Sequence, residues 1–478
     1  MERPILTLGP REFLQGIAPN AHTERGGLFL SATGVTPMYD PGGTASVENG
    51  LLQAGPTPTD IGSSTVVDTI FAADSGVINS QATAAFYGND GNIYRLLTSG
   101  SLTNVRTVST PKAGIRYWRG ALYYWNAAKI GRTTDFSSFS DSAISPLGIG
   151  SNIPAPHVFL DQLYFFANVG QYVSRLTDDT TVEDQVLDFD TSYFGTAISD
   201  DGVNLVVALS SNTQGADVFG ACLILFWDTF SSSWQRDYLI RDPFIWALKR
   251  IGSTLYAFGQ YGIYEVSFGG GVKKVLSRLI GFGTTEDLTS GFGAYRADVY
   301  NQDALIFGTD TTIDTFGSLD SSIPPAYYKH FKVPSAVGTP SCVFANFAVG
   351  SVYVATDGDK LYRYDFDGAT RETGVSFQTV YIPFKEPTQV HRIDVIFGEL
   401  LASGDAFDID TKVDEDTSAV DFGSATFTSD GAIRRKEMHP DKGVQVNNQL
   451  SIVGNFTAGA AKIKRIEIFG QPLTLGTN

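Results

Sequence analysis

The residue types that most often carry catalysis or bind metals are present in this chain but are not paired. It has five histidines, which are His22, His157, His330, His391 and His439. None of them stands in an HxH or HxxxH spacing, at which two imidazoles share one metal ion. No Gly-x-Ser-x-Gly elbow, no P-loop and no dinucleotide-binding glycine motif occurs. We therefore expect no catalytic centre, no cofactor and no metal site.

The two cysteines are also poor candidates for chemistry. Cys222 and Cys342 each stand in an apolar, strand-like run. A cysteine in such a run is most often a small buried hydrophobic residue, and a disulfide-stabilised scaffold would use more cysteines in a shorter chain. The sequence predicts two buried free thiols.

Carboxylates gather between residues 405 and 416, where oxygen ligands for a divalent cation could be supplied. The acidic residues are Asp405, Asp408, Asp410, Asp414, Glu415 and Asp416. Their spacing does not match the twelve-residue calcium loop of helix-loop-helix proteins. Asp408 and Asp410 are two residues apart and would share one face of a strand. We interpret the stretch as a solvated strand edge and loop, and leave a bound divalent ion open.

Basic residues are concentrated at two places near the C-terminal end of an otherwise acidic chain. These six residues are Arg434, Arg435, Lys436, Lys462, Lys464 and Arg465. The chain as a whole carries a net charge of −17, which disfavours wrapping by nucleic acid. We predict that this basic set makes an interface to an acidic neighbour, including another copy of the chain. Local ion pairs on a solvated face are the alternative.

The elements that would position these residues are strands. The stretch Gly350–Asp367 contains two short apolar runs joined by an Asp-Gly turn, which is typical of a β-hairpin. The same pattern recurs about seven times, aligned on Phe86, Leu122, Leu163, Leu205, Leu255, Leu305 and Val352. The spacing, roughly 36 to 50 residues, is that of a propeller blade. We predict a β-propeller of six or seven blades over residues 61–370.

The segments on either side of the repeats have different residue patterns. Residues 1–60 are rich in Pro and Gly and predict an irregular N-terminal arm. After residue 370 six or seven runs alternate between apolar and polar residues, as in Val390–Phe397, Ala406–Val413, Val444–Val446 and Gln449–Val453. Such alternation predicts half-buried strands, and their number predicts a C-terminal β-sandwich over residues 371–478. The fold class is all-β.

Composition limits the remaining possibilities. Hydrophobic residues make up 42% of the 478 residues and charged residues 18%, so the chain can bury a core. No apolar run approaches the ~20 residues of a membrane span. Met1 is followed by Glu2, Arg3 and Pro4 rather than by the start of a secretory signal. We expect a protein made and kept in a cytosol-like compartment until assembly.

The order of these parts resembles the tail nozzle proteins of short-tailed bacteriophages, also called packaged-DNA stabilisation proteins. The resemblance lies in the Pro-Gly turn at Met38–Gly43, the propeller, and a terminal β-domain carrying the basic runs Arg434–Lys436 and Lys462–Ile468. It covers the whole layout and rests on no diagnostic motif.

The resemblance implies a homo-hexameric ring below the portal and adaptor proteins. Such a ring closes the DNA exit channel and holds tail fibres or spikes. The protein would then assemble in the bacterial cytoplasm into the virion tail. An acidic lumen would repel phosphate and let viral double-stranded DNA pass without specific binding.

The alternative function is a propeller that binds a carbohydrate or protein receptor on a baseplate or cell surface. Exposed aromatic residues in loops would favour it, and Trp234, Trp118 and Trp125 are candidates. The mass of the native assembly separates the two functions, because a nozzle is a closed ring and a soluble binder is a monomer.

Overall fold

The computed structural model divides the chain into two compact units. The propeller unit consists of residues 58–311 and 333–364, and the terminal unit of residues 1–57, 312–332 and 365–478. The structure describes residues 3–13, 29–33, 35–39, 50–62, 65–126, 129–145, 155–167, 170–211, 221–277, 295–300, 304–309, 312–317, 326–334, 338–345, 347, 350–365, 370–413, 419–440 and 445–473.

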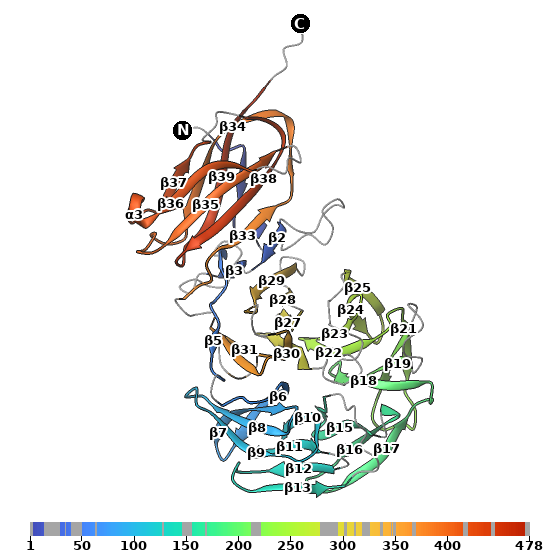
Figure 1. Ribbon diagram of the computed structural model, residues 1–478. Coiled ribbons are helices and arrows are strands. Elements are labelled where there is room, and N and C mark those ends of the chain that lie inside the picture. The colour runs from blue at the N-terminus through green and yellow to red at the C-terminus, as the bar shows by residue number, and fades with distance from the viewer. Residues whose placement is uncertain are drawn as a thin grey trace. The chain divides into compact units, whose positions relative to one another are not determined.

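The repeats fold as the blades of a seven-bladed β-propeller, within the predicted range of six or seven (Figure 1). Each blade is an antiparallel meander, and the recurring sequence pattern forms its second and third strands. The first strands are β6 (Ile70–Ile78), β10 (Pro111–Trp118), β14 (His157–Phe159), β18 (Tyr193–Asp200), β22 (Ile245–Ile251), β26 (Ala297–Tyr300) and β30 (Pro340–Phe344). The second strands are β7 (Gln81–Gly88), β11 (Ala121–Asn126), β15 (Gln162–Ala167), β19 (Leu205–Ser211), β23 (Thr254–Gly259), β27 (Ala304–Gly308) and β31 (Ser351–Thr356).

The outer half of each blade completes the sheet. The third strands are β8 (Asn92–Leu97), β12 (Lys129–Thr133), β16 (Tyr172–Leu176), β20 (Cys222–Trp227), β24 (Gly262–Ser267), β28 (Thr312–Gly317) and β32 (Lys360–Asp365). The fourth strands are β9 (Leu102–Thr107), β13 (Phe139–Ile144), β17 (Val182–Asp188), β21 (Arg236–Ile240), β25 (Gly271–Ser277), β29 (Ala326–Lys332) and β5 (Thr59–Asp60). Six blades lie wholly in the propeller unit, whereas β28 and β29 belong to the terminal unit.

The circle of blades is closed by a strand from before the first blade. Strand β5 pairs antiparallel with β32, so that Asp60 faces Tyr362 and Thr59 faces Arg363. The first strand of the last blade, β30, also contacts β6 of the first blade. Blade seven is therefore built from both ends of the repeat region, which ties the ring shut.

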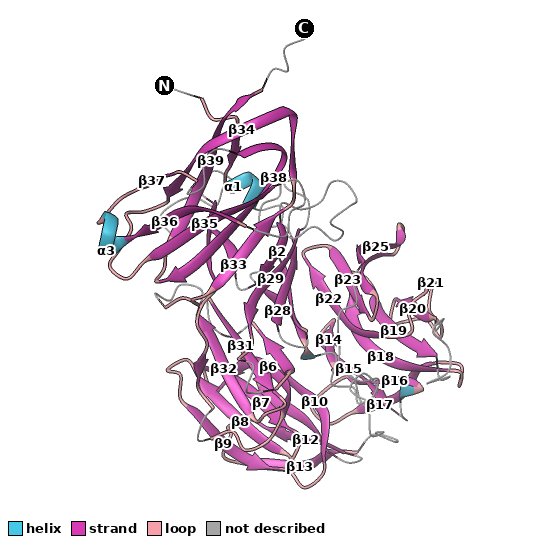
Figure 2. Cartoon of the chain, turned by 45° about the horizontal axis from the view of Figure 1, so that its top comes forward, coloured by secondary structure: helices cyan, strands magenta, loops and turns pink. Residues whose placement is uncertain are grey.

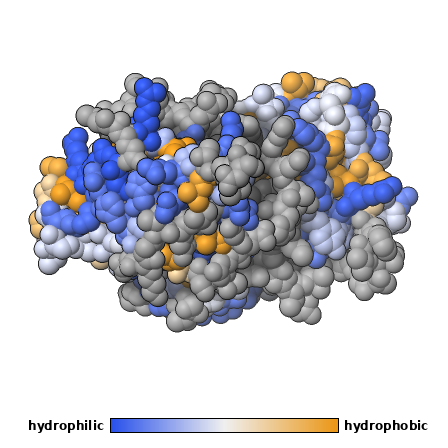
Figure 3. Space-filling view, turned by 90° about the horizontal axis from the view of Figure 1, so that it is seen from above, coloured by the Kyte–Doolittle hydropathy of each residue, from blue (hydrophilic) through white to orange (hydrophobic). Residues whose placement is uncertain are grey.

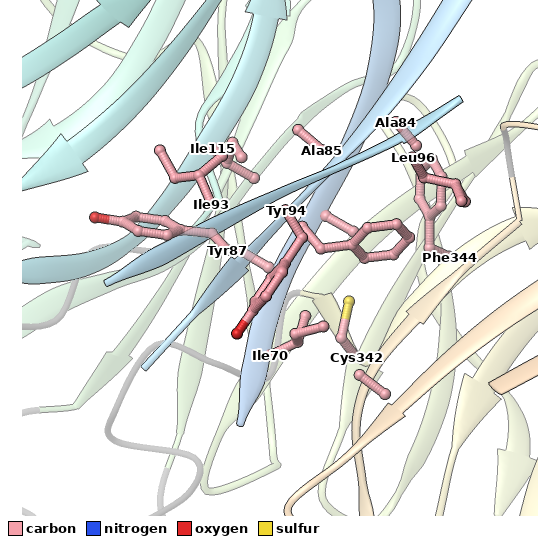
Figure 4. Close-up of a cluster of buried hydrophobic side chains, with 14 of the residues drawn as sticks. Ile70, Ala84, Ala85, Tyr87, Ile93, Tyr94, Leu96, Ile115, Cys342 and Phe344 are labelled. Carbon is pink, nitrogen blue, oxygen red and sulfur yellow. The ribbon is translucent and has the colours of Figure 1, made fainter. Parts of the chain in front are cut away.

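The core lies between neighbouring blades. One cluster of buried side chains joins blades seven, one and two, and Figure 4 shows part of it. Phe344 of β30 lies edge-on to Phe86 of β7, with ring centroids 5.9 Å apart. Tyr87 makes a similar contact with Tyr124 of the next blade at 6.3 Å. Each fully buried aromatic side chain contributes roughly 1.5–3 kcal/mol, so these contacts bind one blade to the next.

In each of two blades, a buried aspartate holds the turn between the second and third strands. Asp242 precedes β22 and accepts hydrogen bonds from the amide groups of Gln260 and Tyr261, both at 2.9 Å, and from the Tyr264 hydroxyl at 3.0 Å. Asp68 does the same before β6, where it accepts from the amide of Asp90 at 3.1 Å. Hydrogen bonds to a charged acceptor contribute about 1.5–3 kcal/mol each, so the carboxylate holds the turn between the second and third strands.

The terminal unit is a branched sheet, antiparallel except where β2 (Phe29–Thr33) pairs with β29, in which the two ends of the chain meet (Figure 2). Its N-terminal strands are β1 (Leu6–Leu8), β2 (Phe29–Thr33), β3 (Val35–Tyr39) and β4 (Gly50–Ala54). Its C-terminal strands are β33 (Val375–Thr379), β34 (Ile382–Phe397), β35 (Ala406–Val413), β36 (Val420–Thr426), β37 (Arg435–Met438), β38 (Gln445–Ala458) and β39 (Lys462–Pro472). The described helices, α1 (Pro10–Phe13) and α3 (Phe427–Asp430), are single turns.

Residues 1–60 are predicted to form an irregular arm, but their described strands β1, β2 and β4 belong to the sheet of the terminal unit. Strands β1 and β4 pair with β39, and β2 pairs with β33. An extended Pro- and Gly-rich segment cannot build a core of its own, but it can add strands to a sheet made elsewhere. The first 57 residues are therefore grouped with the terminal unit.

The long strands β34 and β38 change partners along their length. Strand β34 pairs with β38 over its first half and with β37 over its second, while β39 lines its other edge. Strands that switch sheets in this way form the corners between packed layers. Phe377, Phe407 and Phe456 pack together from three of the strands, with ring centroids 5.0–6.4 Å apart. All these strands belong to one hydrogen-bonded sheet, so the division into a two-sheet sandwich stays a prediction.

Candidate functional site

The first strands of blades two to six surround a polar cavity of about 260 Å³. This central cavity is lined by titratable side chains on first strands: Arg116, His157, Asp200, Lys249, Arg250 and Asp298. First strands need no charge for their pairing, because their hydrogen bonds use only the backbone. A set of titratable side chains from five successive blades is therefore the most distinctive chemical feature of the propeller unit.

The carboxylates of the cavity already have partners. Asp200 accepts a hydrogen bond at 2.8 Å from the imidazole of His157 and is ion-paired with Arg250. Burial opposes its ionisation, but these two partners outweigh burial and lower the pKa of Asp200. Asp298 accepts from the backbone amides of Val299 and Ala345, both at 2.8 Å. Their negative charge is therefore largely compensated within the fold.

Asp74 lies beside the cavity on β6 and is held by its neighbours. It accepts a hydrogen bond at 2.7 Å from the amide of Tyr117 and lies 3.5 Å from a guanidinium nitrogen of Arg116. Burial nevertheless raises the pKa of Asp74, because loss of hydration outweighs the attraction of the arginine.

The cations of the cavity are less well satisfied. Lys249 has no hydrogen-bond or ion-pair partner among the described residues, although it lines the cavity. Loss of hydration lowers the pKa of Lys249, the charge of Asp298 opposes this shift, and the charge of Arg116 adds to it. Arg116 contacts Asp74 at ion-pair distance but makes no hydrogen bond within the described part of the chain. Burial also lowers the pKa of His157, despite the hydrogen bond with Asp200.

Two of the three arginines of the predicted basic set, Arg435 and Arg465, face carboxylates of the same sheet. Arg435 on β37 and Arg465 on β39 flank Ile396 of the strand between them. Asp394 and Glu467 face one another two positions further along these strands, on the same side of the sheet. Arg435 pairs with Asp394, whose side chain is completely buried, and Arg465 lies 3.0 Å from Glu467. Both arginines are therefore engaged within the chain.

The remaining basic residues divide into paired and solvated ones. The two lysines with ion-pair partners are Lys436, which contacts Asp430, and Lys462, which lies 3.0 Å from Glu399. Arg434 and Lys464 are exposed, and neither has an ion-pair partner among the described residues. Local ion pairs thus account for four of the six residues, and the interface stays a prediction carried by the other two.

The acidic stretch is split between different roles. Asp405 is buried and accepts hydrogen bonds from the amides of Ala402 at 2.9 Å and Ala460 at 2.7 Å, so it fastens a turn. Asp408 and Asp410 do share one face of β35, as predicted. Loss of hydration raises the pKa of both, and their acidic neighbours raise it further. Residues 414–416 lie outside the described residues. No group of three or more His, Cys, Asp or Glu placed to hold a metal ion occurs in the described part of the chain.

The cysteines are buried free thiols, as predicted. Burial raises the pKa of Cys222 to about 12 and also raises that of Cys342. Neither thiol is a thiolate at neutral pH, so neither is an activated nucleophile.

The three tryptophans considered for recognition fall into two groups. Trp118 and Trp125 are buried in the core, and Trp234 is 37% exposed in the loop between β20 and β21. Three further apolar residues are exposed: Phe230 in the same loop, Leu239 on β21, and Phe268 directly after β24. We call these four residues, together with Arg236, the aromatic rim of blades four and five.

The loop that carries Phe230 and Trp234 is held by hydrogen bonds within it and to a neighbouring blade. Asp228 accepts hydrogen bonds from the amides of Phe230 at 2.9 Å and Ser231 at 2.8 Å. Thr229 adopts a φ of 68°, which costs a β-branched residue of order 1–3 kcal/mol, and its carbonyl accepts from Arg175 at 3.2 Å. This fixed loop leaves Phe230 85% exposed.

Strands β21 and β24 are connected across the aromatic rim. Arg236 donates to the carbonyl of Phe268 at 2.5 Å, and its guanidinium lies 5.0 Å from the centre of the Phe268 ring. The Tyr238 hydroxyl donates to the same carbonyl at 2.8 Å. Elsewhere, Figure 3 shows one face of the chain on which small hydrophobic patches stand among hydrophilic residues.

Comparison with known proteins adds little beyond the fold. No protein-family model matches the chain, and no curated protein matches it. One similar solved structure, described as "Crystal Structure of Mitotic Checkpoint Complex", contains a chain that aligns with a TM-score of 0.45 and 12% identity. The alignment covers 72% of this chain and 99% of that one. In the described residues no helix is long and apolar enough to cross a membrane.

Sequence reasoning missed the central cavity and Phe230. The signal for the cavity was present, since Arg116, Lys249 and Asp298 each interrupt an apolar run that begins a repeat. That signal is weak in a single repeat and becomes visible only when all first strands are aligned.

Proposed function

We propose that this chain is a structural docking protein without catalytic activity, and that its aromatic rim binds a protein neighbour. In its more specific form the proposal follows the resemblance to tail nozzles: a homo-hexameric ring in the virion tail of a short-tailed bacteriophage, contacting adaptor or portal proteins and tail fibres or spikes. The neighbour at the rim is then a second copy of this chain. The propeller is the part of this proposal that the fold itself supplies.

The observation that carries the proposal is the fixed exposure of Phe230. A large apolar side chain in water is unfavourable, and here the loop beneath it also holds the unusual φ of Thr229. Aromatic residues and arginine are the side chains enriched at the centres of protein interfaces. Because the loop is already ordered, binding costs little conformational entropy.

Charge supports the passage of DNA without attachment. The net charge of −17 repels phosphate, and four of the six residues of the basic set are neutralised by partners within the chain.

The experiment is native mass spectrometry of the purified chain and two variants. Phe230→Ser should abolish or weaken the six-fold assembly. Val203→Ser is the matched control, because Val203 is 76% exposed on another loop of blade four and lies outside the aromatic rim. Equal assembly of both variants would remove the aromatic rim from the proposal.

The second candidate function is recognition of a carbohydrate or protein receptor. Trp234 favours it, because an exposed indole beside charged side chains is a common recognition surface. A stable wild-type monomer in the same mass measurement would reject the ring. A glycan or protein ligand whose binding is lost in Trp234→Ala and retained in Val203→Ser would establish this function instead.

A further inference from the structure

The central cavity has an imbalance that the docking function does not use. Its carboxylates are satisfied, because Asp200 is paired twice and Asp298 accepts two backbone amides. Lys249 has no partner among the described residues, and Arg116 has N–H donors that make no hydrogen bond there. The carboxylate of Asp298 attracts Lys249, but the cavity lacks an acceptor group in direct contact with Lys249 and with the unused N–H donors of Arg116.

The two cations are close enough to disfavour one another. Lost hydration has the largest effect on the pKa of Lys249 and lowers it; the charge of Asp298 raises the pKa, and the charge of Arg116 lowers it. An ammonium that loses part of its hydration without gaining a direct partner is costly, and a second cation nearby increases the cost. An anion that contacts both would remove the repulsion and replace the missing hydration at once.

The size and donor geometry of the cavity define the ligand class. A volume of about 260 Å³ compares with roughly 30 Å³ for one water molecule, so a small ion fits together with several waters. Guanidinium groups bind carboxylates and phosphates through two parallel hydrogen bonds, and lysine adds a point charge. We propose that the central cavity is a binding site for a compact oxyanion, a phosphate or a carboxylate, held between Lys249 and Arg116.

The first strands that form the site are held by the blade cores, so binding requires no new fold. Arg116 follows Ile115, and Lys249 follows Leu248, both buried. Lys249 is the side chain to change, because Arg116 also compensates Asp74 and its removal would disturb the core.

Isothermal titration of the full chain with inorganic phosphate and, separately, with acetate tests the proposal and distinguishes the two ligand chemistries. We expect one of the two to bind, and Lys249→Met to weaken binding at least about tenfold, which corresponds to ~1.4 kcal/mol. Lys273→Met is the matched control, since Lys273 is an exposed residue on β25 of the same blade. It should bind like the wild type.

A thermal measurement separates a binding role from a structural one. Without added anion, Lys249→Met should unfold at the same or a higher temperature than the wild type, because an uncompensated cation has been removed. The bound anion should raise the unfolding temperature of the wild type and of Lys273→Met, but not that of Lys249→Met. Lys249→Arg, which keeps the charge, should retain binding.

Two results would overturn the proposal: neither anion binds the wild type, or Lys249→Met binds as tightly as Lys273→Met. Phe230→Ser should bind the anion normally, so a failure of the docking function and a failure of this site give different patterns.

Discussion

Two completely buried aspartates and one half-buried lysine show how differently this fold compensates an ionised side chain. Asp394 is completely buried and is matched by Arg435. Asp242 is equally buried, and backbone amides such as that of Gln260 surround it. Lys249 has neither kind of partner among the described residues. Uncompensated charge at a buried site is costly, and perturbed side chains of this kind gather at functional sites.

Removing a carboxylate from the acidic face of β35 should change the stability of the chain by an amount that depends on pH. Loss of hydration and then the charge of Asp421 raise the pKa of Asp410 in the folded state. The folded chain therefore holds this proton more tightly, and stability falls as pH rises from the unfolded value through the folded pKa. Asp410→Asn should raise stability at pH 7 by less than ~1 kcal/mol, because the residue is largely solvated.

Thermal unfolding at several pH values tests this expectation. The gain should disappear below about pH 4, where aspartate is protonated in both states. Asp237→Asn, on an exposed strand of the propeller unit, is the control and should change little at either pH. A wild-type protein stabilised by millimolar calcium, with the stabilisation lost in Asp410→Asn, would instead make the stretch a cation site.

At the scale of elements, the sequence predicted what lies inside the sheets and missed what lies at their edges. The second and third strands of all seven blades were predicted, because they are apolar runs separated by turn residues, as in β31 and β32. The fourth strands were not located. Strands such as β9 and β17 are half exposed and mix polar with apolar residues, so their composition resembles that of loops.

In the terminal unit, too, strands with recurring apolar residues were predicted and a polar strand at an edge was missed. The alternation of Val390–Phe397 and Ala406–Val413 located parts of β34 and all of β35. Two expected strands, around residues 445 and 451, are one strand, β38, because a long strand that changes partners needs no turn between its halves. Strand β37 was missed, since Arg435–Met438 is a polar run whose pairing depends on the distant strand β34.

The closure of the propeller by β5 gives a prediction about one element. The amide of Ile61 donates to the carbonyl of Leu361 at 3.0 Å, next to the short pairing of β5 with β32. Ile61→Pro removes this donor and should destabilise the propeller unit by about 2–3 kcal/mol. Hydrogen exchange should then accelerate in β32 and in β6.

Thr98→Pro is the control for this substitution. Thr98 occupies the second position of the turn in which the Gly100 amide donates to the Leu97 carbonyl, where proline is favoured. It should leave exchange in β32 unchanged. Equal protection of β32 in Ile61→Pro and in the wild type would mean that β5 does not close the ring.

At the scale of the whole molecule, net charge opposes assembly. Six copies, each at −17, together carry about −102 charges, so a ring requires contacts that are locally balanced or apolar. The aromatic rim is an apolar candidate for such a contact. Arg434 and Lys464 are the basic candidates, because their positive charges are not neutralised by an ion pair within the described residues.

This division of the basic set changes which variant tests the interface. Reversing Arg434, Arg435 and Lys436 together would be expected to spare the fold if all three were solvated, but Arg435 compensates the buried Asp394. Arg435→Ala should therefore destabilise the terminal unit by about 1–3 kcal/mol. The double variant Arg434→Glu, Lys464→Glu removes no ion pair and should leave the unfolding temperature unchanged.

If the basic interface exists, the double variant should require roughly tenfold more protein for half assembly, or ~1.4 kcal/mol, in sedimentation velocity runs. Exposed pairs contribute only ~0–1 kcal/mol each, so both charges must be reversed to produce an effect of this size. Added salt should weaken wild-type assembly in the same direction, because charges more than ~10 Å apart are screened at 0.1 M. A double variant that assembles like the wild type across the salt series would show that Arg434 and Lys464 are solvated, and that the ring is held by apolar contacts alone.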